Sequence, residues 1–161
     1  MERPLQPGTR LPKVTLFDPE LKPVVLSELA RGQTTALNFF PAAFSKSCTS
    51  ELCAFRDSLG DYAASGAQVG GIPTDSPFTL KMFAQSLGLG YPLFSDYNRE
   101  AIRAFGVVQP EYQGLRELPR RSTFVVDSLG TVHYAWVSDA AHLEPPYAQL
   151  QKAVVKLVKE G

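Results

Sequence analysis

Short apolar runs alternate with amphipathic stretches along most of this chain of 161 residues. The runs at 34–40 and 68–72 have the length and composition typical of strands. Between them, residues 47–64 carry apolar side chains at spacings of four, three, four and three, which is one continuous face of a single helix. The side chains on that face are Cys48, Leu52, Phe55, Leu59 and Tyr62. This pattern predicts a helix with one buried side between two strands.

The second half of the chain continues the alternation. Residues 76–89 carry a helical apolar pattern with Gly88 as a stop signal. Dense prolines at 4–23 and near 110–119 predict loops or irregular edges. The remaining predictions are an extended piece at 91–96, a short helix at 98–106, strands at 122–127 and 131–137, and a helix at 145–160. Together these elements predict an α/β fold, with a central mixed β-sheet, helices on both faces and an antiparallel final strand pair.

Length and composition bound the class of protein. A chain of this length can bury an adequate core, so residues 1–161 are expected to form a single domain. No apolar stretch reaches the roughly 18 residues of a membrane span. Sixteen basic and sixteen acidic side chains cancel, so no overall field favours nucleic acid or an anionic bilayer. The N-terminal segment carries charges and prolines where a secretory signal needs an apolar region, which favours a cytoplasmic location.

The chain has two cysteines, Cys48 and Cys53, and a reducing cytosol disfavours a structural disulfide between them. The remaining roles are metal binding, catalysis or simple burial. The two histidines, His133 and His142, lie far along the chain, and no second Cys or His pair has zinc-like spacing. We therefore expect no metal site.

Helix geometry keeps the two cysteines apart. Cys53 lies five residues after Cys48, about 140° around the helix, so the two Cα atoms are expected roughly 8 to 9 Å apart. An unstrained disulfide needs Cα atoms within about 7 Å of each other. A disulfide would require the helix to unwind locally, so the pair predicts a reversible switch and not a structural brace.

The position of Cys48 in the predicted helix favours a reactive thiol. It lies in or next to the first turn of the predicted helix, after Ser45 and Ser47 as candidate N-caps. Unpaired N–H groups and the positive end of the helix dipole there favour a thiolate, which is the nucleophilic form. Burial is an alternative interpretation, because free cysteine often behaves as a small apolar side chain. Cys53 could equally be an inert, partly exposed residue, Pro41 could only end the strand, and Ser45 could only cap the helix.

Three ordered segments of the chain form a pattern that resembles a known family. Pro41, Ser45 and Cys48 match the peroxiredoxin signature Pro-x-x-x-Thr/Ser-x-x-Cys, and a second cysteine five positions on resembles the bacterioferritin-comigratory-protein or Q-type subgroup. Residues 68–96 are similar to the family's segment of strand, Asp-Ser turn, helix and Pro-Leu-x-Ser-Asp. Residues 119–137 are similar to its Arg-x-Thr-Phe-x-x-Asp-x-x-Gly hairpin. The resemblance covers nearly the whole chain.

The resemblance implies a thioredoxin-like fold of the peroxiredoxin type and a peroxidase that reduces hydrogen peroxide or organic hydroperoxides with thiols. By carry-over, Cys48 is the peroxidatic cysteine, whose thiolate attacks the peroxide and becomes a sulfenic acid. Arg121 would favour the thiolate and stabilise charge on the peroxide oxygens. Ser45 would hydrogen-bond the substrate, and Pro41 would shield the thiolate from water.

The same resemblance makes Cys53 the resolving cysteine, which attacks the sulfenic acid after local unfolding. Thioredoxin or a glutaredoxin-like donor would then reduce the disulfide. The resemblance implies that no metal, haem or flavin cofactor is needed. It also implies a monomeric protein, with a dimer as the alternative. Glu51, three residues after Cys48 as in many members, is expected to organise the site and ranks below the other residues.

The sequence departs from the family pattern at several positions. Ser45 stands where threonine is commoner, and "SKSC" replaces the Thr-Pro-Gly-Cys typical of the subgroup. Leu80 occupies the neighbourhood of a frequent histidine. Arg120 lies beside Arg121, and only the alignment to the following Ser-Thr-Phe selects Arg121.

Three other functions compete with this interpretation. One is a peroxidase that uses Cys48 alone and takes an external thiol as resolver. Another is a protein-disulfide oxidoreductase on the same fold, although the chain lacks the Cys-x-x-C motif of that class. The last is a redox-inert binding or holdase module, in which Cys48 reacts with peroxide no faster than a free thiol.

Overall fold

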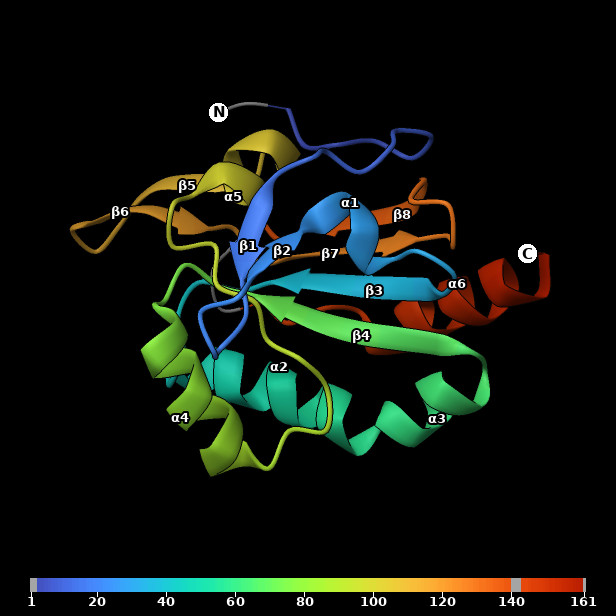
Figure 1. Ribbon diagram of the computed structural model, residues 1–161, viewed down its shortest axis with the longest axis horizontal. Coiled ribbons are helices and arrows are strands. Elements are labelled where there is room, and N and C mark those ends of the chain that lie inside the picture. The colour runs from blue at the N-terminus through green and yellow to red at the C-terminus, as the bar shows by residue number, and fades with distance from the viewer. Residues whose placement is uncertain (1–2, 140–142, 161) are drawn as a thin grey trace.

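A central four-stranded sheet organises the computed structural model, which describes residues 3–139 and 143–160 and so leaves His142 outside the description. The sheet order is β4-β3-β7-β8 (Figure 1). β3 and β4 run parallel, whereas the β3–β7 and β7–β8 pairs are antiparallel. The strands are β3 (Thr34–Phe39), β4 (Ala67–Ile72), β7 (Ser122–Val126) and β8 (Val132–Val137). The predicted mixed sheet with an antiparallel final pair is confirmed.

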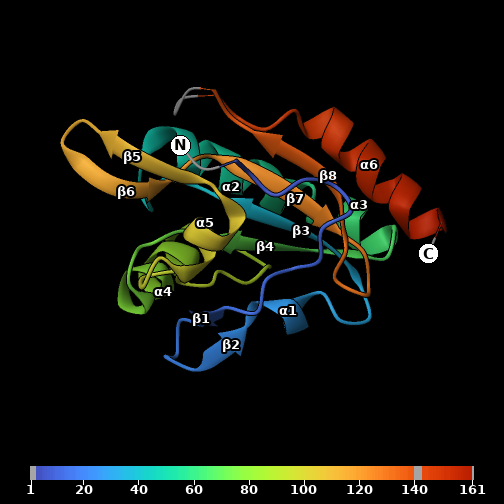
Figure 2. The same cartoon turned by 90° about the horizontal axis from the view of Figure 1, so that it is seen from above.

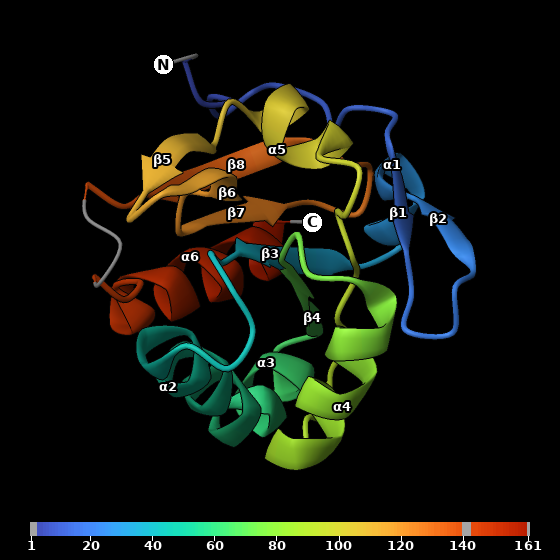
Figure 3. The same ribbon diagram turned by 90° about the vertical axis from the view of Figure 1, so that its left-hand side faces the viewer.

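Layers of different composition cover the two faces of the sheet (Figure 3). One face packs against four helices: α2 (Lys46–Asp57), α3 (Leu59–Ala64), α4 (Pro77–Leu87) and α6 (Tyr147–Glu160). The other face packs against α1 (Leu26–Leu29), β1 (Thr15–Phe17) and α5 (Glu100–Phe105), with β2 (Pro23–Val25) paired to β1. Side chains from β3 and its end reach both layers by alternation, since Ala36 and Phe40 join the first core while Leu37 and Phe39 join the second.

The single helix predicted over 47–64 is wrong, because the structure has two helices, α2 and α3, that meet at Ser58. Ser58 has φ −96° and ψ 2°, outside the helical range, and Gly60 follows closely. Serine and glycine are weak helix formers, which explains the break. The predicted buried face is nevertheless present. Four of its five residues have described side chains, and all four are at most 2% exposed: Cys48, Leu52, Phe55 and Tyr62. The fifth, Leu59, has a side chain outside the description.

The proline-rich stretches are not only loops. β1 and β2 form one antiparallel pair, and β5 (Val108–Tyr112) and β6 (Leu115–Pro119) form another. The β5–β6 hairpin extends away from the central sheet (Figure 2). Proline is tolerated in such two-stranded edges, where its missing N–H removes no partner. Because β1 and β2 have only three residues each, and β5 and β6 are mostly polar and contain proline, none of them carries the apolar alternation that identifies a buried strand.

Gly71 on β4 determines where the predicted extended piece at 91–96 runs. The N–H of Gly71 donates to the Pro92 carbonyl at 3.1 Å, and the N–H of Phe94 donates to the Gly71 carbonyl at 2.8 Å. A Cβ at Gly71 would lie 2.6 Å from the Leu93 side chain, so a residue larger than glycine would push this segment away. The close approach fixes Tyr91, at the start of the segment, over the helix layer.

Candidate active site

The turn between β3 and α2 carries the signature residues. Phe44 adopts a left-handed backbone conformation with φ 65°, which is unfavourable for a bulky residue. Its ring lies 4.8 Å from that of Phe83 on α4. The N–H of Ala43 donates to the Asp75 carboxylate at 2.9 Å. These two contacts from the neighbouring segment hold the turn in the shape that starts α2 at the end of β3.

Ser45 is the N-cap residue of α2, but its side chain does not cap the helix. The hydroxyl instead donates to the Ala42 carbonyl at 3.1 Å, within the same turn. A hydroxyl that has used its proton in this way still has oxygen lone pairs that can accept from a ligand. Cys48 follows as the third residue of the helix, so the prediction that it lies in the first turn is confirmed.

Cys48 is fully buried and contacts a cation. Arg121 Nη2 donates to the Cys48 sulfur at 3.1 Å, and Arg121 is itself only 2% exposed. The sheet explains this long-range contact. The register of β3 with β7 places Ser122 opposite Phe39, so Arg121 lies at the end of β3 where the chain turns into α2. The alignment that selected Arg121 over Arg120 agrees with the structure, in which Arg120 donates to the Ser138 carbonyl instead.

Glu51 completes a three-residue network. It lies one helical turn after Cys48, on the same side of α2, and accepts from Arg121 Nη1 at 2.6 Å. Its other oxygen has no hydrogen-bond partner among the described residues. Burial raises the pKa of Glu51 to about 8, against the lowering effect of the Arg121 cation. Glu51 therefore contacts Arg121 directly, which is the arrangement expected of a residue that organises the site.

The network directs positive charge at the sulfur. Burial disfavours the charge on Arg121, but the adjacent Glu51 and Cys48 outweigh burial and raise the pKa of Arg121, so the guanidinium stays charged. Burial opposes ionisation of the Glu51 carboxyl and the Arg121 cation favours it, so the two groups are coupled through their 2.6 Å contact. A buried cation at hydrogen-bond distance from the sulfur can stabilise negative charge that develops there, in the same direction as the helix dipole.

A pocket opens beside this network. Pro41 and Arg121 form part of its wall, and Gln109 and Tyr112 of the β5–β6 hairpin form another part. Pro41 is half-buried, as expected of a residue at the mouth of a site. The arrangement provides access for a small molecule next to the cation that contacts Cys48.

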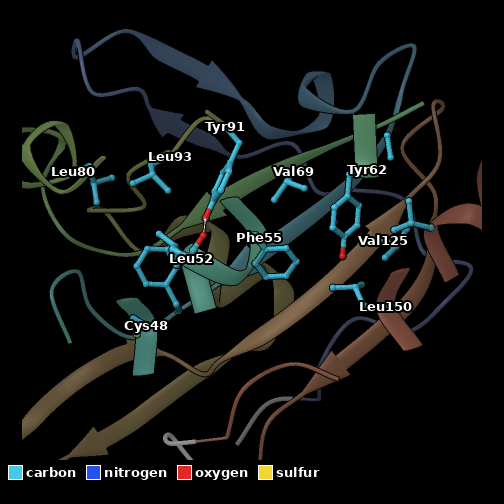
Figure 4. Packing of buried hydrophobic residues seen from close by; sticks show 14 of the residues in the cluster. Cys48, Leu52, Phe55, Tyr62, Val69, Leu80, Tyr91, Leu93, Val125 and Leu150 are labelled. Carbon is cyan, nitrogen blue, oxygen red and sulfur yellow. Dashed lines mark hydrogen bonds between the residues drawn. The ribbon is translucent and has the colours of Figure 1, made fainter. Parts of the chain in front are cut away.

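Cys53 lies in a different environment on the same helix. Both cysteines are free thiols, Cys48 buried and Cys53 only partly buried. In Figure 4, Cys48 lies on the apolar side of α2 with Leu52 and Phe55. This agrees with the prediction that the two thiols lie on different faces. The structure thus brings Cys48, Glu51 and Arg121 together and keeps Cys53 outside the network.

Two further features bear on the class of site. Within residues 3–139 and 143–160, no three His, Cys, Asp or Glu side chains cluster as a metal site would require. No helix in the described part of the chain is long and apolar enough to cross a membrane.

Comparison with known proteins decides the family. A model of the AhpC/TSA family matches residues 7–135. The chain belongs to this family, the peroxiredoxins. A peroxiredoxin is a thiol-dependent peroxidase, and peroxide is its substrate. The resemblance inferred from the signature residues is confirmed.

Individual relatives agree with this assignment. The chain is 39% identical over 130 residues to a protein of Mycobacterium tuberculosis (strain ATCC 25618 / H37Rv) that is provisionally named a peroxiredoxin, covering 80% of this chain and 82% of that one. It is 38% identical over 125 residues to the chloroplastic peroxiredoxin Q of Gentiana triflora, covering 78% of this chain and 56% of that one.

Solved structures show the same fold. The crystal structure of peroxidoxin BcpB from Mycobacterium tuberculosis superposes with a TM-score of 0.81 at 28% identity, covering 94% of this chain and 97% of that one. The structure of Xanthomonas campestris peroxiredoxin Q gives a TM-score of 0.76 at 25% identity, covering 96% and 97%. The predicted thioredoxin-like fold of the peroxiredoxin type is therefore confirmed.

Asp75 also shapes this peroxiredoxin's site. Asp75 holds the signature turn through Ala43 and is part of the Asp-Ser turn that resembles the family, but no role was assigned to it. Burial raises the pKa of Asp75, and the Ala43 N–H partly opposes that rise. The sequence carried one signal for this role: Asp75 is an acidic residue in the loop after β4. Loops that follow the carboxyl ends of parallel strands gather at one edge of a sheet, where sites form.

Proposed function

We propose that Cys48 is the peroxidatic cysteine of this peroxiredoxin and that Cys53 resolves its oxidised form. The observation that carries the first part is the 3.1 Å hydrogen bond from buried Arg121 to the Cys48 sulfur. The thiolate attacks the terminal peroxide oxygen, the O–O bond breaks, and the leaving oxygen takes a proton to become water or alcohol. Cys48 is left as a sulfenic acid.

The residues around Cys48 have matching roles. Arg121 stabilises the charge that develops on the leaving oxygen, as a fixed cation does in a buried site. The Ser45 hydroxyl, which donates to Ala42, accepts a hydrogen bond from the peroxide proton. Pro41, which forms part of the pocket wall with Arg121, limits access of water to the thiolate. Hydrogen peroxide and organic hydroperoxides both contain the O–O bond at which these groups act, so both are proposed substrates.

Cys53 then attacks the Cys48 sulfenic sulfur, and hydroxide leaves as water once protonated. The two thiols cannot meet in an intact α2, so residues 48–53 must unwind first. Thioredoxin or a glutaredoxin-like donor returns the disulfide to two thiols, and the protein works as a monomer.

The deciding experiment is stopped-flow oxidation of the reduced protein by stoichiometric hydrogen peroxide, followed by a free-thiol count and intact mass. We expect wild type to lose both thiols with a mass decrease of about 2 Da. Cys53→Ser should oxidise equally fast but stop at the sulfenic acid, about 16 Da heavier. Cys48→Ser should react no faster than free cysteine.

Other outcomes lead to different conclusions. A wild-type Cys48 that reacts only at the rate of free cysteine would show a redox-inert module. If Cys53→Ser turns over with thioredoxin at the wild-type rate, Cys48 works alone with an external resolving thiol.

A further inference from the structure

Two hydrogen bonds join α2 to the end of α4 and the segment that follows it. The Tyr91 hydroxyl donates to the Leu52 carbonyl at 2.8 Å in the buried core, as Figure 4 shows. Arg56 Nη1 donates to the Leu87 carbonyl at 2.6 Å. The chain from 87 to 91 is therefore joined to the second half of α2 by one buried and one partly buried hydrogen bond.

The Tyr91 bond lies where α2 must open. Leu52 directly precedes Cys53 and is four residues after Cys48, so its carbonyl lies within the segment that has to unwind before the two sulfurs can meet. Unwinding moves this carbonyl away from its helical position. The Tyr91 hydrogen bond must break in the same step.

Tyr91 is held by structure that does not belong to α2. Its side chain is 6% exposed and packs in the helix-side core with Leu93. The following residues are fixed to β4 through Gly71. Burial raises the pKa of Tyr91, so the hydroxyl remains a protonated donor. The sheet thus supplies a fixed anchor, and α2 is the part that moves.

We propose that Tyr91 is a positioning residue that slows the opening of α2 and thereby sets the rate at which Cys53 resolves oxidised Cys48. This inference rests on the proposed resolving role of Cys53. In the resolving step, the S–S bond forms as the S–O bond of the sulfenic acid breaks, and the hydroxide leaves as water. While α2 stays closed, a second peroxide can instead oxidise the sulfenic acid to sulfinic acid, releasing water or alcohol. The Tyr91 bond therefore sets the division between turnover and inactivation.

The test is Tyr91→Phe, which keeps the ring and removes the hydroxyl. Rapid acid quenching and mass analysis separate the sulfenic, disulfide and sulfinic forms of Cys48. Loss of one hydrogen bond should speed disulfide formation about three- to tenfold. The rate of the first oxidation should stay within about twofold of wild type, because Tyr91 contacts neither the sulfur nor Arg121. The sulfinic fraction at high peroxide should fall.

Tyr62→Phe is the matched control. Tyr62 is 2% exposed, belongs to the same core and lies 6.0 Å from Phe55 of α2 by ring centroids (Figure 4). Its hydroxyl has no hydrogen bond to α2 among the described residues, so the resolution rate should not change. Arg56→Gln is a second variant at a more exposed side chain, and it should speed resolution about twofold.

The outcomes separate this inference from the proposed function. Resolution in Tyr91→Phe at the wild-type rate or slower overturns the role of Tyr91 and leaves Cys53 as the resolving cysteine. An equal acceleration in Tyr62→Phe would mean general loosening of the core and also overturns it. A wild type that never forms the disulfide overturns both.

Discussion

The two halves of α2 carry chemically identical thiols in contrasting surroundings. In the first half, Cys48 is fully buried against the Arg121 cation, which also contacts Glu51. In the second half, Cys53 is partly buried, and its neighbouring turn is held by hydrogen bonds to the segment at 87–91. One helix thus presents one thiol buried against a cation and one thiol that is only partly buried.

The contacts also differ in kind. The first half is held by buried hydrogen bonds from the Arg121 cation to Cys48 and Glu51, and losing one member of this network leaves an uncompensated polar group. The second half is held by bonds that end on backbone carbonyls, each contributing about 1 kcal/mol net. Changes in the first half should therefore affect the chemistry strongly, and changes in the second half should affect the opening of the helix.

The largest effect should come from Arg121→Gln, which removes the cation from the first half. The rate constant for oxidation of Cys48 should fall about 100-fold, since a fixed group that stabilises developing charge is lost. Single-turnover stopped flow measures this rate. Arg120→Gln is the matched control and should stay within about threefold, because Arg120 bonds Ser138 and not the sulfur. Equal losses in the two variants would contradict the specific role of Arg121.

Ser45→Ala should have a smaller effect on the same rate. The hydroxyl accepts one neutral hydrogen bond from the peroxide in the proposed mechanism, and its loss should slow oxidation about tenfold. Ser45→Thr should restore most of the rate, because it returns a hydroxyl to the same turn. Full activity in Ser45→Ala would show that the Ser45 hydroxyl only braces the turn through Ala42.

Glu51→Gln should change how stability depends on pH. The folded protein keeps the Glu51 proton up to a pKa of about 8, whereas the unfolded chain loses it near 4.5. Between these values the folded state binds more protons, so this group makes the free energy of unfolding fall as pH rises. From pH 5 to 8 wild type should lose at least about 1 kcal/mol more than Glu51→Gln.

Urea unfolding at the two pH values measures that difference. Glu20→Gln is the control, since Glu20 is an exposed partner of Lys81 and should leave the pH dependence unchanged. A wild type and Glu51→Gln with parallel pH profiles would mean that Glu51 ionises normally in the folded state.

The smallest effect should come from Ser50→Ala, on the outward side of the first half. Ser50 donates to Glu144 at 3.1 Å in an exposed position. Stability should change by less than about 0.5 kcal/mol, and the oxidation rate should not change. Thermal unfolding and stopped flow check both. A marked rate loss would show that the outer side of α2 also controls the site.

The sequence was sufficient to predict the strands of the central sheet, the buried face of α2 and the contact of Cys48 with Arg121. Periodicity identifies a buried face because it depends only on neighbours along the chain. It cannot identify which distant side chain reaches that face, so Asp75 and Tyr91 received no role. The pairing of Glu51 with Arg121 likewise depends on the register of β3 with β7, which periodicity along one helix does not reveal.

The errors in the fold have local causes. The break at Ser58 lies within a continuous apolar face, so the apolar pattern continues across two helices. The β5–β6 hairpin has exposed, polar strands with Pro110 inside, and its pairing depends on backbone bonds that leave no apolar pattern.

The pairing of β3 with β7 also orders events during synthesis of the protein. Cys48 is translated early, but its partner is residue 121 of 161 and can reach the sulfur only after β7 has docked beside β3. A nascent chain on the ribosome therefore carries Cys48 as an ordinary thiol through most of its elongation. Under the function proposed above, Cys48 acquires its reactivity toward peroxide only with the completed sheet, and unfinished chains are spared oxidation at that residue.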